Sequence, residues 1–175
     1  MEGLSTCSLE RLSIGRAGCA VIDNVVPSPA VDLLPVLNEP LHLVSGRSRT
    51  RGRKLMGSAT TLAELATHPL VIPSRPHSMR MRLETALANV GCKTRVALEI
   101  ESIPAILDLV KHEELRAGLV LNAIQSTGNE ADFWVRPIRK PKLAATRWID
   151  TSSQRPRGPR IEPRTELVRE LRLEL

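Results

Sequence analysis

The segment Leu70-Val71-Ile72-Pro73-Ser74-Arg75-Pro76-His77-Ser78 decides the fold, because a short apolar run leads through a turn into a helical pattern. Apolar residues recur at helical spacing over 79–90, and Gly91 is a suitable stop signal for that helix. The same sequence of run, turn and helical stretch repeats over 96–111, and a third apolar run covers 117–121. This alternation predicts two successive βαβ units on a parallel sheet.

Each of the first two predicted strands ends directly before a helix, which indicates where a small ligand would bind. Parallel strands place the turns that follow them at one edge of the sheet. Helix N-termini there offer backbone N–H groups and the positive end of a dipole, which suit a carboxylate, sulfate or phosphate. Ser74, Arg75, His77 and Ser102 would add side-chain donors. The alternative is that the serines only cap helices and that Arg75 and His77 only face solvent.

Composition indicates a soluble protein of a reducing compartment. The 175 residues are 42% hydrophobic, and no apolar run approaches the length of a membrane span. The first residues lack the charged and apolar regions of a secretory signal, and the three cysteines form no CxxC pair. We therefore expect a cytoplasmic protein that does not contact a membrane.

The net charge of +6 allows a nucleic-acid surface, and the sequence offers little else for that function. Three aromatic residues in the whole chain cannot form a base-stacking platform, so a solvated basic surface is the preferred interpretation. The sequence contains no HExxH, GxSxG or Walker-type motif, its four histidines are scattered, and no metal-ligand spacing is present. We expect neither an enzyme nor a cofactor. The basic residues group as Arg47, Arg49, Arg51, Arg53 and Lys54; Arg136, Arg139, Lys140, Lys142 and Arg147; and the tail from Arg155 to Arg172.

Several segments resemble one family. Leu37-Asn38-Glu39-Pro40-Leu41-His42-Leu43-Val44 is similar to the lobe-crossing strand in the effector-binding domain of LysR-type transcriptional regulators. Thr61-Leu62-Ala63-Glu64-Leu65 and then 69–77 are similar to the start of that family's second lobe. The match continues through Glu101-Ser102-Ile103-Pro104-Ala105 to Thr151-Ser152-Ser153-Gln154-Arg155-Pro156, and it covers roughly residues 9–171 in the family's order.

The resemblance implies an α/β fold of the type 2 periplasmic-binding-protein kind, with two Rossmann-like lobes joined by two crossover strands. The crossover strands would be Leu41–Val44 and Val135–Ile138. Residues 1–44 would form part of the first lobe, 45–138 the second lobe, and 139–175 the return to the first lobe with a C-terminal helix.

The resemblance also implies a function. A small organic-acid effector would bind in a cleft lined by Asp23, Asn24, Ser74, Arg75, His77, Ser102 and Ile103. The chain would then be the sensing domain of a LysR-family transcriptional regulator, touching DNA only indirectly, and it would form a homo-oligomer or associate with a full-length regulator.

The chain departs from the family pattern, which keeps alternatives open. No helix-turn-helix segment is expected in it, and the first βα units of the first lobe are missing from the match. Glu113-Glu114-Leu115 stands where the family usually has Gly-Leu-Gly, so a strained turn is expected there. One alternative is a non-sensing remnant that acts only by associating with a full-length relative, and another is a solute-binding protein of the same fold.

Overall fold

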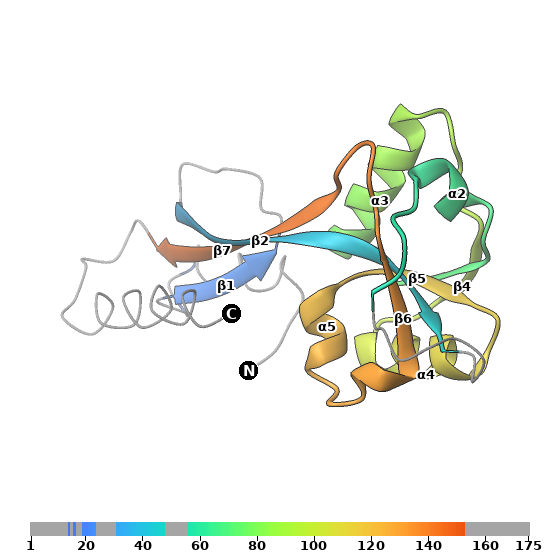
Figure 1. The fold of residues 1–175 in the computed structure, drawn as a ribbon. Helices are drawn as coiled ribbons and strands as arrows, with labels where there is room; N and C mark the ends of the chain where they lie inside the picture. The colour runs from blue at the N-terminus through green and yellow to red at the C-terminus, as the bar shows by residue number, and fades with distance from the viewer. Residues whose placement is uncertain (1–13, 15, 17–18, 24–30, 48–55, 153–175) are drawn as a thin grey trace. The chain divides into compact units, whose positions relative to one another are not determined.

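The computed structural model describes residues 14, 16, 19–23, 31–47 and 56–152. The chain forms two compact units (Figure 1): unit 1 contains Met1–Asn38 and Thr146–Leu175, and unit 2 contains Glu39–Ala145. In unit 1, strand β1 (Cys19–Asp23) pairs antiparallel with β7 (Ala144–Ser152). The helix predicted over 164–175 lies outside the described residues.

Unit 2 contains the predicted alternation of strands and helices. Its strands are the end of β2 (Val31–Gly46), β3 (Leu70–Ile72), β4 (Val96–Glu99), β5 (Arg116–Val120) and β6 (Phe133–Pro137). Its helices are α2 (Leu62–Ala66), α3 (Ser78–Asn89), α4 (Ile103–His112), α5 (Leu121–Gln125) and a 3-10 turn at Glu130–Asp132.

The sheet of unit 2 has the strand order β2-β5-β3-β4, and β6 pairs with β2. Strand β3 runs parallel to both β4 and β5, which confirms the prediction of two βαβ units. Strand β2 is antiparallel to β5 and to β6. Because β5 lies on one side of β3 and β4 on the other, the two crossovers run in opposite directions. Right-handed crossovers then place α3 and α4 on opposite faces of the sheet, as Figure 1 shows.

The helices bury most of the apolar stripes that the sequence predicted, but Val90, at the end of the stripe over 79–90, is 43% exposed. Leu83 of α3 packs on β5 at Gly118, where an added Cβ would lie 3.1 Å from a Leu83 methyl carbon. The last turn of α4 approaches the end of β2 so closely that a Cβ on Gly46 would lie 2.6 Å from the Val110 carbonyl oxygen. The buried apolar residues of these two helices are Met79, Leu83, Ala86 and Leu87 of α3 and Ile106, Leu107 and Val110 of α4.

Two sequence expectations are corrected here. Val135–Ile138 lies within unit 2, and the second strand that runs from one unit into the other, besides β2, is β7. The turn at Glu113 is not strained, because Glu113 is extended with φ −116 and closes α4 through its N–H to the Leu109 carbonyl. Gly91 does stop its helix as predicted, with φ +72.

Candidate functional site

The loops that follow β3 and β4 meet at one edge of unit 2. The N–H of Ser74 donates to the carbonyl of Ile100 at 3.3 Å, and the N–H of Ile100 donates to the carbonyl of Ile72 at 3.0 Å. We call Pro73–His77 together with Ile100–Ile103 the binding edge. The helices after β3 and β4 lie on opposite faces, so this edge is a topological switch point, where open α/β sheets bind ligands.

Both helices begin with a side-chain cap at this edge. His77 is the N-cap of α3, and its Nδ1 accepts a hydrogen bond from the N–H of Met79 at 3.3 Å. Ser102 is the N-cap of α4, and its Oγ accepts from the N–H of Ala105 at 3.4 Å. The caps take the N–H groups of Met79 and Ala105, and Pro104 has no N–H, so in the first three residues of α4 the N–H of Ile103 is the one left for the edge. Ser102 therefore has the capping role that the sequence left as an alternative. The cap by His77 was not predicted, because the alternative for His77 was a side chain that only faces solvent.

Ser74 differs from these two residues. Its backbone groups are used, since its N–H binds Ile100 and its carbonyl accepts from the N–H of His77 at 3.2 Å. Its hydroxyl makes no hydrogen bond to any residue that the structure describes, and the residue is half-buried. A serine hydroxyl can both donate and accept, so the Ser74 hydroxyl is available to bind an anionic oxygen.

Arg75 brings a positive charge to the edge. Its side chain is 60% exposed, and its Nη2 lies 2.6 Å from Oε2 of Glu84 on α3. An ion pair with so much exposure is weak, because water screens it and the long side chain loses entropy when it is held. The guanidinium can therefore exchange Glu84 for another anion.

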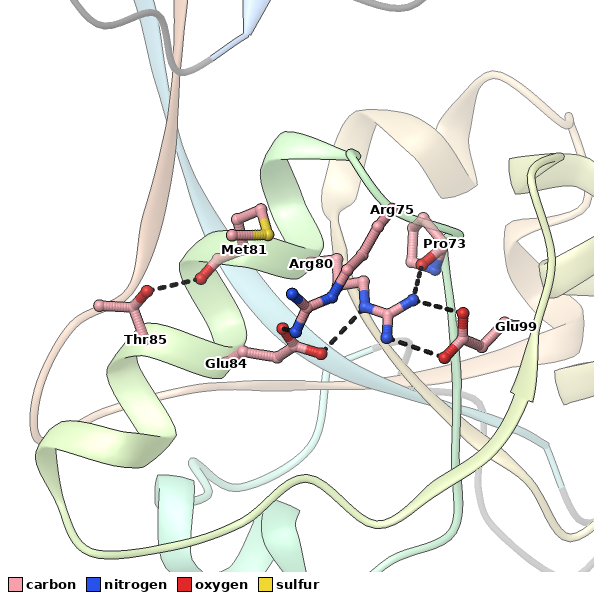
Figure 2. A network of polar contacts seen from close by, with 7 residues as sticks. All are labelled: Pro73, Arg75, Arg80, Met81, Glu84, Thr85 and Glu99. Carbon is pink, nitrogen blue, oxygen red and sulfur yellow. Dashed lines mark hydrogen bonds and ion pairs between the residues drawn. The ribbon is translucent and has the colours of Figure 1, made fainter.

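A buried arginine behind the edge was not predicted from the sequence (Figure 2). Arg80 donates from both terminal nitrogens to Glu99, at 2.6 and 2.8 Å, and from Nε to Glu84 at 2.9 Å. The hydrogen bonds from Arg80 lower the pKa of Glu99, and the same contacts raise the pKa of Arg80. The spacing of Arg80 and Glu84, four residues apart on a helix, was the available signal, but Glu99 could be connected to them only through the sheet.

The remaining predicted effector residues are only partly placed. Ile103 is the first residue of α4 and packs against the core of unit 2. Asp23 ends β1 in unit 1, opposite Arg147 in the register of β7. Asn24 lies outside the described residues. The effector role of all seven residues stays a prediction.

Among the residues that the structure describes, no group of three His, Cys, Asp or Glu side chains could hold a metal ion. A shallow surface pocket lies at the opposite, amino-terminal end of the parallel strands. Its lining is His68, Pro69, Leu98, Leu109, Glu113, Glu114, Leu115 and Arg116.

No helix in the described part of the chain is long and apolar enough to cross a membrane.

The described basic residues are largely engaged within unit 2. Arg136 binds the Glu64 carboxylate at 2.5 Å, donates to the Ser58 carbonyl at 3.0 Å and lies 5.6 Å from the centre of the Trp134 ring. Its hydrogen bonds lower the pKa of Glu64. Arg47 donates to the Ala131 carbonyl at 3.1 Å. Two residues of the predicted basic surface, Arg47 and Arg136, therefore make contacts within unit 2. Arg49, Arg51, Arg53 and Lys54 lie outside the described residues.

Comparisons with known proteins agree on one family. The model of the family described as LysR substrate binding domain matches residues 1–172. The nitrogen assimilation regulatory protein nac of Klebsiella aerogenes is 24% identical over 174 residues, which are 99% of this chain and 54% of that protein. The chain thus spans about half the length of that curated relative.

Solved structures show the same fold. An OxyR mutant of Corynebacterium glutamicum has a TM-score of 0.82 at 14% identity, covering 99% of this chain and 54% of that one. The effector-binding domain of QuiR in complex with shikimate has a TM-score of 0.80 at 13% identity, covering 98% and 79%. The fold is therefore the type 2 periplasmic-binding-protein-like α/β fold of LysR effector-binding domains.

Proposed function

Because this chain belongs to the LysR substrate-binding domain family, we propose that its binding edge recognises the anionic group of a small organic-acid effector. The observation that supports this proposal is the hydrogen bond from Ser74 to Ile100, which brings the starts of α3 and α4 to one edge. Unused N–H groups, the Ser74 hydroxyl and the exposed Arg75 would then surround a carboxylate. The solved QuiR domain holds shikimate, which is a carboxylic acid.

In this proposal each residue of the edge has a separate role. Ser74 donates its hydroxyl to one carboxylate oxygen, and Arg75 exchanges Glu84 for the effector's charge. Ser102 and His77 hold the first turns of α4 and α3 so that their N–H groups stay aimed at the ligand. The apolar side chain of Ile103 would contact the body of the effector.

Calorimetry with matched acid and neutral compounds tests this proposal. Shikimate is compared with its methyl ester, and benzoate with benzamide, so that each pair differs mainly in charge. We expect at least one acid to bind and its neutral partner to bind at least about tenfold more weakly, as loss of a charge-assisted contact requires. Ser74→Ala and Arg75→Gln should weaken that acid, while Arg82→Gln on the exposed side of α3 should not. A neutral compound binding as tightly as its acid would overturn the proposal.

We further propose that the chain is a cytoplasmic sensing domain without enzymatic activity and that it works in an assembly. All four residues of the edge strand β4 are exposed, including the apolar Val96 and Leu98, and such an edge favours association. The partner would be a second copy or a full-length regulator that carries DNA contacts. Light scattering over a concentration series tests self-association, and a mass that stays monomeric throughout would leave the full-length regulator as the only proposed partner.

A further inference from the structure

The structure carries an inference about Arg80, whose side chain is 7% exposed although it carries a full charge. Arginine is rarely buried to this extent unless every part of its guanidinium is paired. Arg80 lies in the first turn of α3, directly behind the loop that contains Ser74 and Arg75. The inference about Arg80 depends on where it lies and on which groups it contacts.

The contacts of Arg80 reach three separate segments. Nη1 donates to the carbonyl of Pro73 at 3.2 Å, just after β3, and both terminal nitrogens bind the carboxylate of Glu99, the last residue of β4. Nε binds Glu84 one turn further along α3. Figure 2 shows the guanidinium lying between the two carboxylates. One planar group thus connects the end of β3, the end of β4 and the helix between them.

These contacts bear directly on the binding edge. Pro73 precedes Ser74, and Glu99 precedes Ile100, so Arg80 joins the residues adjacent to the two that form the Ser74–Ile100 hydrogen bond. The two strands cannot separate without breaking the two-point contact between the Arg80 guanidinium and the Glu99 carboxylate. A planar guanidinium can bind both carboxylate oxygens at once, whereas a lysine ammonium cannot bind them in this way.

Packing alone would not fix this distance. Strand β4 is exposed along its whole length, so few buried side chains hold it against β3. The pairing of β3 with β4 also shifts register after Leu70, which makes the ladder there irregular. The Arg80–Glu99 contact adds a two-point charged side-chain connection to this exposed strand.

We propose that Arg80 is the positioning residue of the binding edge and that it acts through Pro73 and Glu99 to hold the two loops at a fixed separation. The inference rests on the proposed function only in that these loops are the ones an effector would meet. Arg80 itself is screened from a ligand by its partners, so its role is to place Ser74 and the start of α4.

Amide hydrogen exchange of the ligand-free, full-length chain tests the proposal. The reporters are the N–H groups of Ser74, Ile100 and Ala105, and the reference is the centre of β5. In Glu99→Gln and Arg80→Lys we expect the reporters to exchange at least about tenfold faster relative to β5, because a two-point charged contact is lost. Arg82→Lys, a matched change at an exposed position of the same helix, should leave that ratio unchanged.

The outcomes separate positioning from simple stabilisation. If the reporters and β5 accelerate by the same factor, Arg80 only stabilises the fold and the proposal is wrong. Unchanged reporters would also overturn it. Arg80→Met, where it folds, should give the largest ratio. The exchange experiment uses no effector, so it does not depend on the calorimetry. If no acid binds in the calorimetry, the proposed function is rejected, but the conclusion about Arg80 from hydrogen exchange still holds.

Discussion

Strands β3 and β4 lie side by side and run parallel, and each leads into one loop of the binding edge, yet they are held in different ways. All three residues of β3 are buried, whereas all four residues of β4 are exposed. Strand β3 has neighbours on both sides, and β4 lies at the end of the sheet order. One loop of the edge therefore follows a strand buried in the core. The other follows an exposed strand and is held by the partly buried Ile100 and Ile103, the sheet ladder, a helix cap and Arg80.

The largest expected effect comes from removing a side chain of β3. Leu70→Ala should lower the free energy of unfolding by about 2–5 kcal/mol, because it leaves a cavity in the core. Leu98→Ala on β4, where the side chain is 44% exposed, should cost less than about 1 kcal/mol. Urea unfolding followed by circular dichroism measures both values. Equal losses for the two variants would show that β4 is covered by a partner in solution.

A smaller effect is expected from the cap that follows β4. Ser102→Ala should cost about 1 kcal/mol, because the N–H of Ala105 loses its acceptor at the start of α4. Ser102→Asn should restore most of the loss, since asparagine is an equally good N-cap. The same urea experiment compares them, and a loss that asparagine fails to restore would mean that Ser102 does more than cap.

The free energy that Arg80 contributes through Glu99 should depend on pH. The folded chain lowers the pKa of Glu99 chiefly through its hydrogen bonds from Arg80, so the unfolded chain binds this proton more readily. The stabilisation is therefore complete above the ordinary glutamate pKa and is lost as the pH falls through the lowered one. Glu99→Gln should flatten the acid limb of stability against pH. Urea unfolding at a series of pH values measures this slope, and an unchanged acid limb in Glu99→Gln would contradict the prediction.

The smallest effect concerns the competition for Arg75. Glu84→Gln weakens the ion pair that holds Arg75, so the acid that binds in calorimetry should bind about two- to fivefold more tightly. Weaker binding would contradict this prediction and would show that the contacts of Glu84 with Arg75 and Arg80 are needed to place the edge for the ligand. Glu114→Gln, at an exposed position at the opposite end of the parallel strands, serves as the control for the loss of one negative charge.

The sequence predicted the elements of unit 2 well, because their patterns are local. The stripe of Leu83 and Leu87 and the cap at Ser102 can be recognised within one helix turn of their partners. The exposure of β4 could not be predicted from the sequence. Val96 and Leu98 are apolar and would be expected in the core, and only the strand order shows that they lie on an edge strand.

The candidate site was predicted in part for the same reason. Ser74 and Ser102 followed from where strands end, but the role of Arg80 depends on Glu99, nineteen residues away on a neighbouring strand. Short helix α5 was also not predicted, since Val120 supplies no side-chain cap to signal its start. Residues that meet only because two strands pair in the sheet have no fixed separation in the sequence, so such contacts cannot be predicted from residue spacing.

Gly46 sets a limit on how freely this sequence can drift. Any side chain there would meet the carbonyl oxygens of Val110 and Lys111 at 2.6 and 2.7 Å, so even alanine requires α4 to move. Gly91 has open space around it and is constrained only by its positive φ, which asparagine tolerates. In a randomised library the first position would accept glycine alone, while the second would accept a small set of residues. The two glycines are thus constrained for different physical reasons: Gly46 by the lack of space for a side chain, and Gly91 by its backbone conformation.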